Sequence, residues 1–143
     1  MKGISFISVD AIQQFMIDVF EALGTPRDEA QICADVLITS DLRGIESHGV
    51  GRLKYYYDRI QAGVQFTTTE VEIVKETETT AVIDGHHGMG HVIAHRAMRL
   101  AMDKARAYGL GAVAASGGSP SLPMAVRLLS LGRLRRYAAA RRK

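Results

Sequence analysis

Apolar residues recur at helical spacing through the first 42 residues and predict two helices. The first amphipathic helix is predicted over residues 9–23, with Ser8 as its N-cap and Gly24 just past its end. Its apolar positions are Ile12, Phe15, Met16, Val19, Phe20 and Leu23. Thr25 and Pro26 then predict an N-cap and a first helical residue for a second helix, which runs to about residue 41. The apolar positions of this helix are Ala30, Cys33, Ala34, Leu37 and Ile38. The two segments together predict a helical hairpin.

Beyond the hairpin, the spacing of apolar residues changes from helical to alternating and back. A third helix is predicted over residues 51–61, closed by Gly63. Short strands with a turn between them are predicted by VEIVKE (71–76) and TTAVID (79–84).

A glycine-rich turn, DGHHGMG, leads into a further helix predicted over residues 91–108. The small residues predicted on its buried face imply close packing against a neighbour; this face comprises Ala94, Ala97, Met98, Ala101 and Ala105. LGAVAA (110–115) predicts another buried strand, entered through Gly109. The fold class is therefore mixed α/β, with an N-terminal helical hairpin followed by a strand-helix-strand portion.

Acidic and basic residues are distributed unevenly near the end of the chain. The formal net charge is +3, but all 15 Asp and Glu residues precede residue 116, and residues 116–143 contain Lys and Arg without acids. A nucleic-acid-binding domain spreads its cations over one folded face, so this distribution argues against nucleic acid as a partner. The sequence predicts two parts, residues 1–115 and a basic tail over residues 116–143.

Hydropathy and cysteine content restrict the class of protein further. With 47% hydrophobic and 23% charged residues, the composition is that of a globular domain. No apolar run approaches the roughly 20 residues that span a bilayer, so we predict no membrane association and a cytoplasmic location. The single cysteine, Cys33, lies on an apolar helical face, where a core role is expected rather than a reactive one.

Polar and aromatic residues gather in the stretch DLRGIESHGVGRLKYYY, residues 41–57. If this stretch is helical, His48, Arg52 and Tyr56 form one stripe at i, i+4 and i+8, with Ser47 as N-cap. The stripe combines a group that titrates near neutral pH, a cation that binds carboxylates and a hydroxyl. Its glycines predict a bent entry where backbone approaches a ligand or another subunit. The alternative is structural: Arg52 pairs with Asp41 or Glu46, and His48 caps or packs.

The run DLRGIESHGVGRLKYYYDRIQAG resembles the malate/L-lactate dehydrogenase family, which is distinct from the classical Rossmann lactate dehydrogenases and includes ureidoglycolate and sulfolactate dehydrogenases. The family motif reads approximately DxRGxxSHGxxRxxxY. The matching residues are Asp41, Arg43, Gly44, Ser47, His48, Gly49, Arg52 and Tyr56. The strand, glycine turn, helix and strand downstream are also similar, so the resemblance covers about residues 5 to 115.

This resemblance implies an NAD- or NADP-dependent oxidoreductase of 2-hydroxy and 2-oxo acids, and a homo-oligomer, expected to be a dimer. His48 takes the role of proton donor to the substrate carbonyl, and Arg52 that of the carboxylate ligand. Ser47 and Tyr56 are expected to bind the substrate or hold His48. No cofactor-binding residue is assigned, because most of the family's cofactor site lies beyond residue 115.

Departures from the family pattern lead to an alternative function. SGGSP stands at residues 116–120, where family members carry a segment like RNSNHFG, and family members are also much longer. We therefore expect a truncated dehydrogenase that is inactive alone. The alternative is a non-enzymatic dimerisation or anion-binding module with a basic tail.

The glycine turn admits two interpretations of its own. Gly88, Gly90 and Ala94 form G-x-G-x-x-x-A, as in a dinucleotide fingerprint, although the family resemblance implies a non-Rossmann cofactor fold. A tight turn with close helix packing explains these glycines more simply. Exposed positions likewise explain the histidines of this region better than a metal site does, and no metal is predicted; these are His86, His87, His91 and His95.

Overall fold

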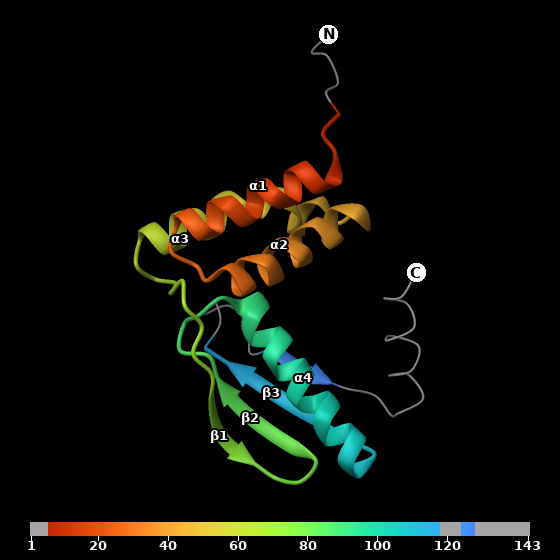
Figure 1. The fold of residues 1–143 in the computed structure, drawn as a ribbon. Helices are drawn as coiled ribbons and strands as arrows, with labels where there is room; N and C mark the ends of the chain where they lie inside the picture. Colours follow the sequence, from red (N-terminus) through yellow and green to blue (C-terminus); the bar gives the residue numbers. More distant parts are fainter. Residues whose placement is uncertain (1–5, 118–123, 128–143) are drawn as a thin grey trace. The chain divides into compact units, whose positions relative to one another are not determined.

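The computed structural model describes residues 6–117 and 124–127. The chain divides into two compact units, residues 1–68 and residues 69–143, which are considered one at a time (Figure 1). The division at residue 115 that the sequence suggested stays a prediction. The mixed α/β fold class is confirmed, because the first unit is helical and the second contains a sheet with one helix.

The first unit opens with α1 (Val9–Ala22), whose predicted caps are confirmed. The Ser8 hydroxyl accepts a hydrogen bond from the Ala11 amide at 3.3 Å, and Gly24 follows the helix with a φ of +94°. The buried face differs from the predicted one: Phe15 is 53% exposed, whereas Ile17 is buried beside Met16. The helix turns this face toward its neighbour in the hairpin, where the Gln13 amide donates to Asp35 at 2.6 Å.

The second helix of the hairpin, α2, spans Arg27–Leu42 and buries all five predicted apolar positions. Its start corrects the sequence analysis, because Pro26 is the N-cap and Thr25 is not. The Thr25 amide donates to the Phe20 carbonyl at 3.0 Å, which holds Thr25 in the turn between the helices. The Pro26 carbonyl accepts the first helical bond, from Ala30 at 2.8 Å. The Thr25 hydroxyl is consequently buried without a hydrogen-bond partner.

Two short 3-10 turns, η1 (Glu46–His48) and η2 (Val50–Arg52), connect the hairpin to α3 (Leu53–Gln61). The predicted third helix is confirmed, although its first two residues belong to η2. Gly63 follows with a φ of +69°, as expected for a residue just beyond a helix.

The second unit contains a four-stranded sheet of order β1-β2-β3-β4. Its strands are β1 (Glu72–Glu76), β2 (Thr80–Asp84), β3 (Ala112–Ser116) and β4 (Met124–Arg127). Strands β2 and β3 are parallel, whereas the outer pairs are antiparallel. The first three strands match the prediction; β4 was not predicted and lies within the tail. Helix α4 (Gly90–Tyr108) connects the two parallel strands.

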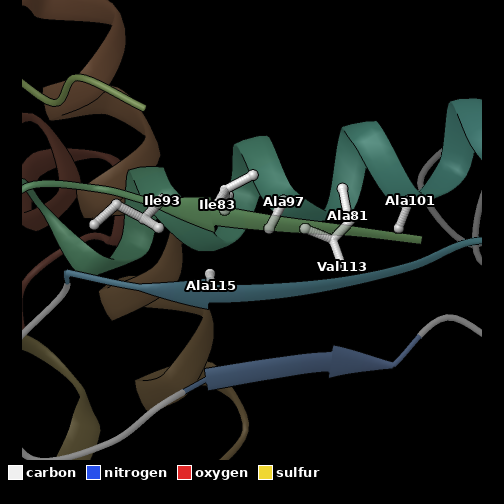
Figure 2. Close-up of a cluster of buried hydrophobic side chains, with 7 residues drawn as sticks. All are labelled: Ala81, Ile83, Ile93, Ala97, Ala101, Val113 and Ala115. Atoms are coloured by element: carbon white, nitrogen blue, oxygen red, sulfur yellow. The ribbon is translucent and has the colours of Figure 1, made fainter. Parts of the chain in front are cut away.

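Small side chains form the core between α4 and the sheet. Figure 2 shows this cluster, in which α4 faces β2 and β3; it comprises Ala81, Ile83, Ile93, Ala97, Ala101, Val113 and Ala115. A Cβ at Gly111 would overlap the carbonyl of Ala101, so helix and strand approach closely, as the sequence predicted. Two residues of the predicted buried face, Ala94 and Met98, are only half-buried.

Strand β1 forms one edge of the described sheet, and all five of its residues are exposed. Its pairing with β2 shifts register between Ile73 and Lys75, which leaves Val74 outside the ladder as a bulge. The turn between β1 and β2 contacts α4, because the nearly buried Lys104 ammonium donates a hydrogen bond to the Thr77 carbonyl at 2.6 Å. The same ammonium lies 2.8 Å from a carboxylate oxygen of Glu76.

Candidate functional site

The motif residues of the first unit do not share one helix, so the predicted stripe is wrong. His48 ends η1 and Arg52 ends η2, while Tyr56 lies in α3. Gly49 separates the two turns with extended backbone, at φ −94° and ψ −148°. The i, i+4, i+8 spacing therefore does not align these side chains by helical geometry.

Gly44 terminates α2 and accounts for the first bend of the motif. Its φ is +73°, and its amide donates to the Asp41 carbonyl at 2.9 Å. The Ile45 amide donates to the Ser40 carbonyl at 2.9 Å, which completes a Schellman motif. This glycine therefore caps a helix, rather than providing the close backbone approach to a ligand that we expected of the motif glycines.

Ser47 connects the histidine and the arginine through two different atoms. Its hydroxyl lies 2.9 Å from Nδ1 of His48, and its carbonyl accepts a hydrogen bond from Nε of Arg52, also at 2.9 Å. Ser47 is not an N-cap, because it lies inside η1. The arginine contact is to a carbonyl, in contrast to the carboxylate pairing of the structural alternative. His48, Ser47 and Arg52 thus form one connected group on two adjacent turns.

The hydrogen bonds within this group do not use Nε2 of His48 or the Nη groups of Arg52, which can therefore contact a ligand. When Nδ1–H of His48 donates to the Ser47 hydroxyl, Nε2 of the ring is the atom that can accept or release a proton. Because the bond to Ser47 uses Nε, the two Nη groups of Arg52 are not engaged by that bond. A planar Nη pair suits a carboxylate, and a protonated imidazole can donate a proton from Nε2. His48 and Ser47 are exposed, and Arg52 is half-buried.

One aromatic ring of α3, that of Tyr55, lies against the arginine. The Arg52 guanidinium carbon lies 5.3 Å from the centre of the Tyr55 ring, within cation–π range. Tyr56 packs instead toward α1, with its ring centre 6.2 Å from that of Phe20. Burial, the largest cause, raises the pKa of Tyr56, while the Arg52 charge acts in the opposite direction. Tyr56 is therefore partly a core residue, and its predicted role as a substrate ligand stays a prediction.

In the second unit, packing accounts for the glycine turn. A Cβ at Gly85 would overlap the Ile93 side chain, and one at Gly88 would lie 2.8–2.9 Å from Thr69. The Met89 amide at the start of α4 is also engaged, because it donates to the Thr69 hydroxyl at 3.1 Å. The crowding at Gly85 and Gly88 supports the interpretation as a tight turn with close helix packing, whereas nothing lies within 4 Å of a Cβ at Gly90.

The histidines of this unit do not all occupy exposed positions. His86 and His87 are exposed, whereas His91 and His95 are half-buried in α4, which corrects our expectation. His86 lies 3.1 Å from a Glu72 carboxylate oxygen. Burial lowers the pKa of His91 to about 4. Within residues 6–117 and 124–127, no cluster of three His, Cys, Asp or Glu side chains is arranged to hold a metal ion.

Comparison with known proteins identifies the family of this chain. A family model described as malate/L-lactate dehydrogenase matches residues 7–119, most of the chain. The chain belongs to this family. Among its relatives, the malate dehydrogenase of Pyrococcus abyssi is 46% identical over 108 residues, which are 76% of this chain and 30% of the relative. The malate/(S)-sulfolactate dehydrogenase of Methanothermus fervidus is 40% identical over 107 residues, 75% of this chain and 32% of the relative.

Solved structures of the malate/L-lactate dehydrogenase family agree with the fold. The sulfolactate dehydrogenase of Methanocaldococcus jannaschii matches with a TM-score of 0.78 at 37% identity, over 80% of this chain and 33% of that one. The chain therefore spans about a third of the length of the relatives it matches.

One contact of this family motif was missed by the sequence analysis. The Asp41 carboxylate accepts a hydrogen bond from the Val50 amide at 2.7 Å, and so connects the end of α2 to η2. The only signal in the sequence was the conjunction of an acid and a small residue, Asp41 and Gly49, eight positions apart. That spacing indicates a contact between Asp41 and Val50 only when the chain reversal at Gly44 is known.

Two further properties of this family member follow from the described residues. Cys33 is fully buried, and burial, with a smaller contribution from Glu29, raises the pKa of its thiol to about 12, as suits a core residue. None of the described helices combines the length and the apolar character needed to cross a membrane.

Proposed function

We propose that the chain carries the substrate-binding portion of a dehydrogenase that interconverts 2-hydroxy and 2-oxo acids. The observation that supports this proposal is the connected group of His48, Ser47 and Arg52, which presents a proton donor and a carboxylate ligand on adjacent turns. Relatives that act on malate and sulfolactate support the substrate class.

In this proposal, the Arg52 Nη groups bind the substrate carboxylate and orient the adjacent carbonyl. In reduction, His48 as the imidazolium donates its Nε2 proton to the carbonyl oxygen and becomes neutral, keeping Nδ1–H bonded to the Ser47 hydroxyl. In oxidation, Nε2 of the neutral ring accepts the proton from the substrate hydroxyl. Ser47 holds the ring through Nδ1, while Tyr56 lines the site from α3. Orientation by Arg52 matters because proton transfer requires hydrogen-bond distance between Nε2 and the substrate oxygen.

A dehydrogenase reaction also moves a hydride, and we propose NAD or NADP as its carrier. The chain spans about a third of the length of its relatives, and by the family resemblance most of the cofactor site lies beyond residue 115. We therefore expect little or no dehydrogenase activity from these 143 residues alone. Titration calorimetry with NADH and NADPH tests this expectation, and micromolar binding would contradict it.

Substrate binding can be tested on the chain itself. In ¹⁵N-labelled protein, malate, lactate and sulfolactate should shift the resonances of His48 and Arg52, and Arg52→Lys should weaken binding about tenfold. Arg59→Lys is the matched control, because Arg59 also lies over the Tyr55 ring, at 5.4 Å, but bonds Gln65 instead of Ser47. Equal affinities of the two variants would exclude Arg52 as the carboxylate ligand.

The alternative function, a non-enzymatic dimerisation or anion-binding module, is favoured only by exposed apolar residues of the hairpin, such as Phe15 and Val36. A dimeric assembly and a cytoplasmic location stay predictions. Sedimentation velocity measures the assembly. Salt-dependent DNA binding measures anion recognition, which should weaken steeply with salt if phosphates are bound.

A further inference from the structure

Asp41 lies at the end of α2, yet its carboxylate reaches the turn that carries Arg52. The carboxylate accepts a hydrogen bond from the Val50 amide at 2.7 Å, a short distance for an amide donor and typical of a charged acceptor. Val50 is the first residue of η2, and the residue before it, Gly49, follows His48 directly. The bond therefore anchors the backbone between the histidine and the arginine.

Gly49 makes this contact possible. It is buried, and a Cβ at this position would overlap the carboxylate of Asp41. At Gly51, two residues further, nothing lies within 4 Å of such a Cβ. Gly49 and Gly51 thus differ: Gly49 provides space for the Asp41 side chain, whereas Gly51 borders open space.

We infer that Asp41 is a positioning residue for the proposed acid site, an inference that rests on the function proposed above. The helix end holds Asp41, because its own carbonyl is engaged in the cap at Gly44. The side chain then fixes the start of η2, which in turn places Arg52 where its Nε reaches the Ser47 carbonyl. The separation between His48 and Arg52 is set by this link rather than by a continuous helix.

The first test measures the link without any ligand. In the full chain, Asp41→Ala should accelerate hydrogen exchange of the Val50 amide about tenfold or more, since a charge-assisted bond is lost. It should also shift the ¹⁵N resonance of His48 Nδ1, as the Ser47 contact loosens. Asp41→Asn retains an acceptor oxygen and should restore most of the protection. Asp58→Ala, which removes a carboxylate from an exposed pair with Lys54, is the control.

A second pair of variants covers the case in which Asp41→Ala fails to fold. Gly49→Ala should disturb the same Val50 and His48 signals, whereas Gly51→Ala should leave them unchanged. Unaltered Val50 exchange in both Asp41→Ala and Gly49→Ala would overturn the inference. So would equal disturbance by Gly51→Ala, because the effect would then not depend on the Asp41 contact.

The ligand titration separates this inference from the proposed function. If the parent chain binds malate or sulfolactate, Asp41→Ala should weaken binding about tenfold, while Asp58→Ala should not. Unchanged affinity in Asp41→Ala, with Val50 exchange accelerated, would overturn the positioning role. If the parent binds none of these acids, the proposed function fails while the exchange measurement still decides whether Asp41 fixes η2.

Discussion

The two units of the chain differ in the largest side chains of their cores. The helical unit buries Phe20, Met16 and Leu37 beside small residues, whereas the cluster between α4 and the sheet combines alanines with Ile and Val and has no aromatic residue among the described side chains. Large side chains hold helices apart and fill the space between them. Small ones allow the backbone of a helix to approach a sheet closely.

The two units also differ in the role of their glycine-rich turns. In the α4–sheet unit, the glycine turn is filled by Ile93 and Thr69. In the helical unit, the turns after α2 keep His48 and Ser47 exposed while their backbone is anchored. Similar glycine-rich sequences therefore serve packing in one unit and the presentation of reactive side chains in the other.

The largest expected effect concerns the exposed histidine of the helical unit, His48. In a complete enzyme made by joining residues 1–115 to the remainder of a relative, His48→Ala should lower kcat by about 10²- to 10⁴-fold, because general acid catalysis is lost. His86→Asn, in the other unit, should retain nearly the parent kcat. Steady-state kinetics measures both, and equal losses would remove the proposed distinction between the two histidines.

Cavity formation should affect the large-residue core most. Phe20→Ala should lower the free energy of unfolding by about 3–5 kcal/mol, since Phe20 is fully buried. Phe15→Ala on the same helix should change it by only about 0.5 kcal/mol, because Phe15 is mostly exposed. Urea denaturation followed by circular dichroism gives both values. Similar losses would mean that α1 buries a different face.

Acid should destabilise the α4–sheet unit through His91. Burial lowers the pKa of His91 from 6.5 to about 4, so the unfolded chain binds this proton more readily. The corresponding stability is present above about pH 6.5 and is lost as the pH falls toward 4, by up to about 3 kcal/mol. Unfolding free energies of the parent and His91→Gln between pH 7 and 4 should converge. Parallel curves would contradict this assignment.

Overpacking should be the specific weakness of the small-residue core. Ala101→Leu should lower the unfolding free energy by about 1–3 kcal/mol, because α4 and β3 have no room for the added atoms. Arg99→Leu, exposed on the same helix, provides the control and should change it little. Urea denaturation distinguishes the two, and a stable Ala101→Leu variant would show that the sheet can move away.

The smallest expected effect is a gain in stability. Thr25→Val should raise the free energy of unfolding by about 1 kcal/mol, since it replaces a buried hydroxyl that has no hydrogen-bond partner. Thr39→Val, exposed on α2, should not change it noticeably. Thermal unfolding measures the difference, and a loss on substituting Thr25 would indicate that its hydroxyl is hydrogen-bonded in solution.

The fold was largely predictable because periodicity depends on local sequence. Ser8 and Gly24 bounded α1 correctly, and the alternation in TTAVID located β2. The errors arose where tertiary context decides. Phe15 matched the helical period, but the hairpin turned Ile17 inward instead. Pro26 is the N-cap instead of Thr25, because the first helical bond, from the Ala30 amide, goes to the Pro26 carbonyl.

The candidate site was predictable in its residue types but not in its geometry. The family motif identified His48 and Arg52, yet spacing alone favoured a helix that the structure replaces with two turns. Glycine permits either outcome, and the choice follows from the Schellman motif at Gly44 and the bond from Val50 to Asp41. Both contacts need the chain to reverse, which a one-dimensional pattern does not encode.

The bulge at Val74 has a consequence for how copies of this protein behave at high concentration. An edge strand with regular backbone would offer its amides and carbonyls to the same strand of another molecule. Here the register shift interrupts that pattern, and the exposed carboxylate of Glu72 would repel its counterpart on an approaching copy, whereas Glu76 is paired with Lys104. The β1 edge is thus protected mainly by an irregularity of its own backbone.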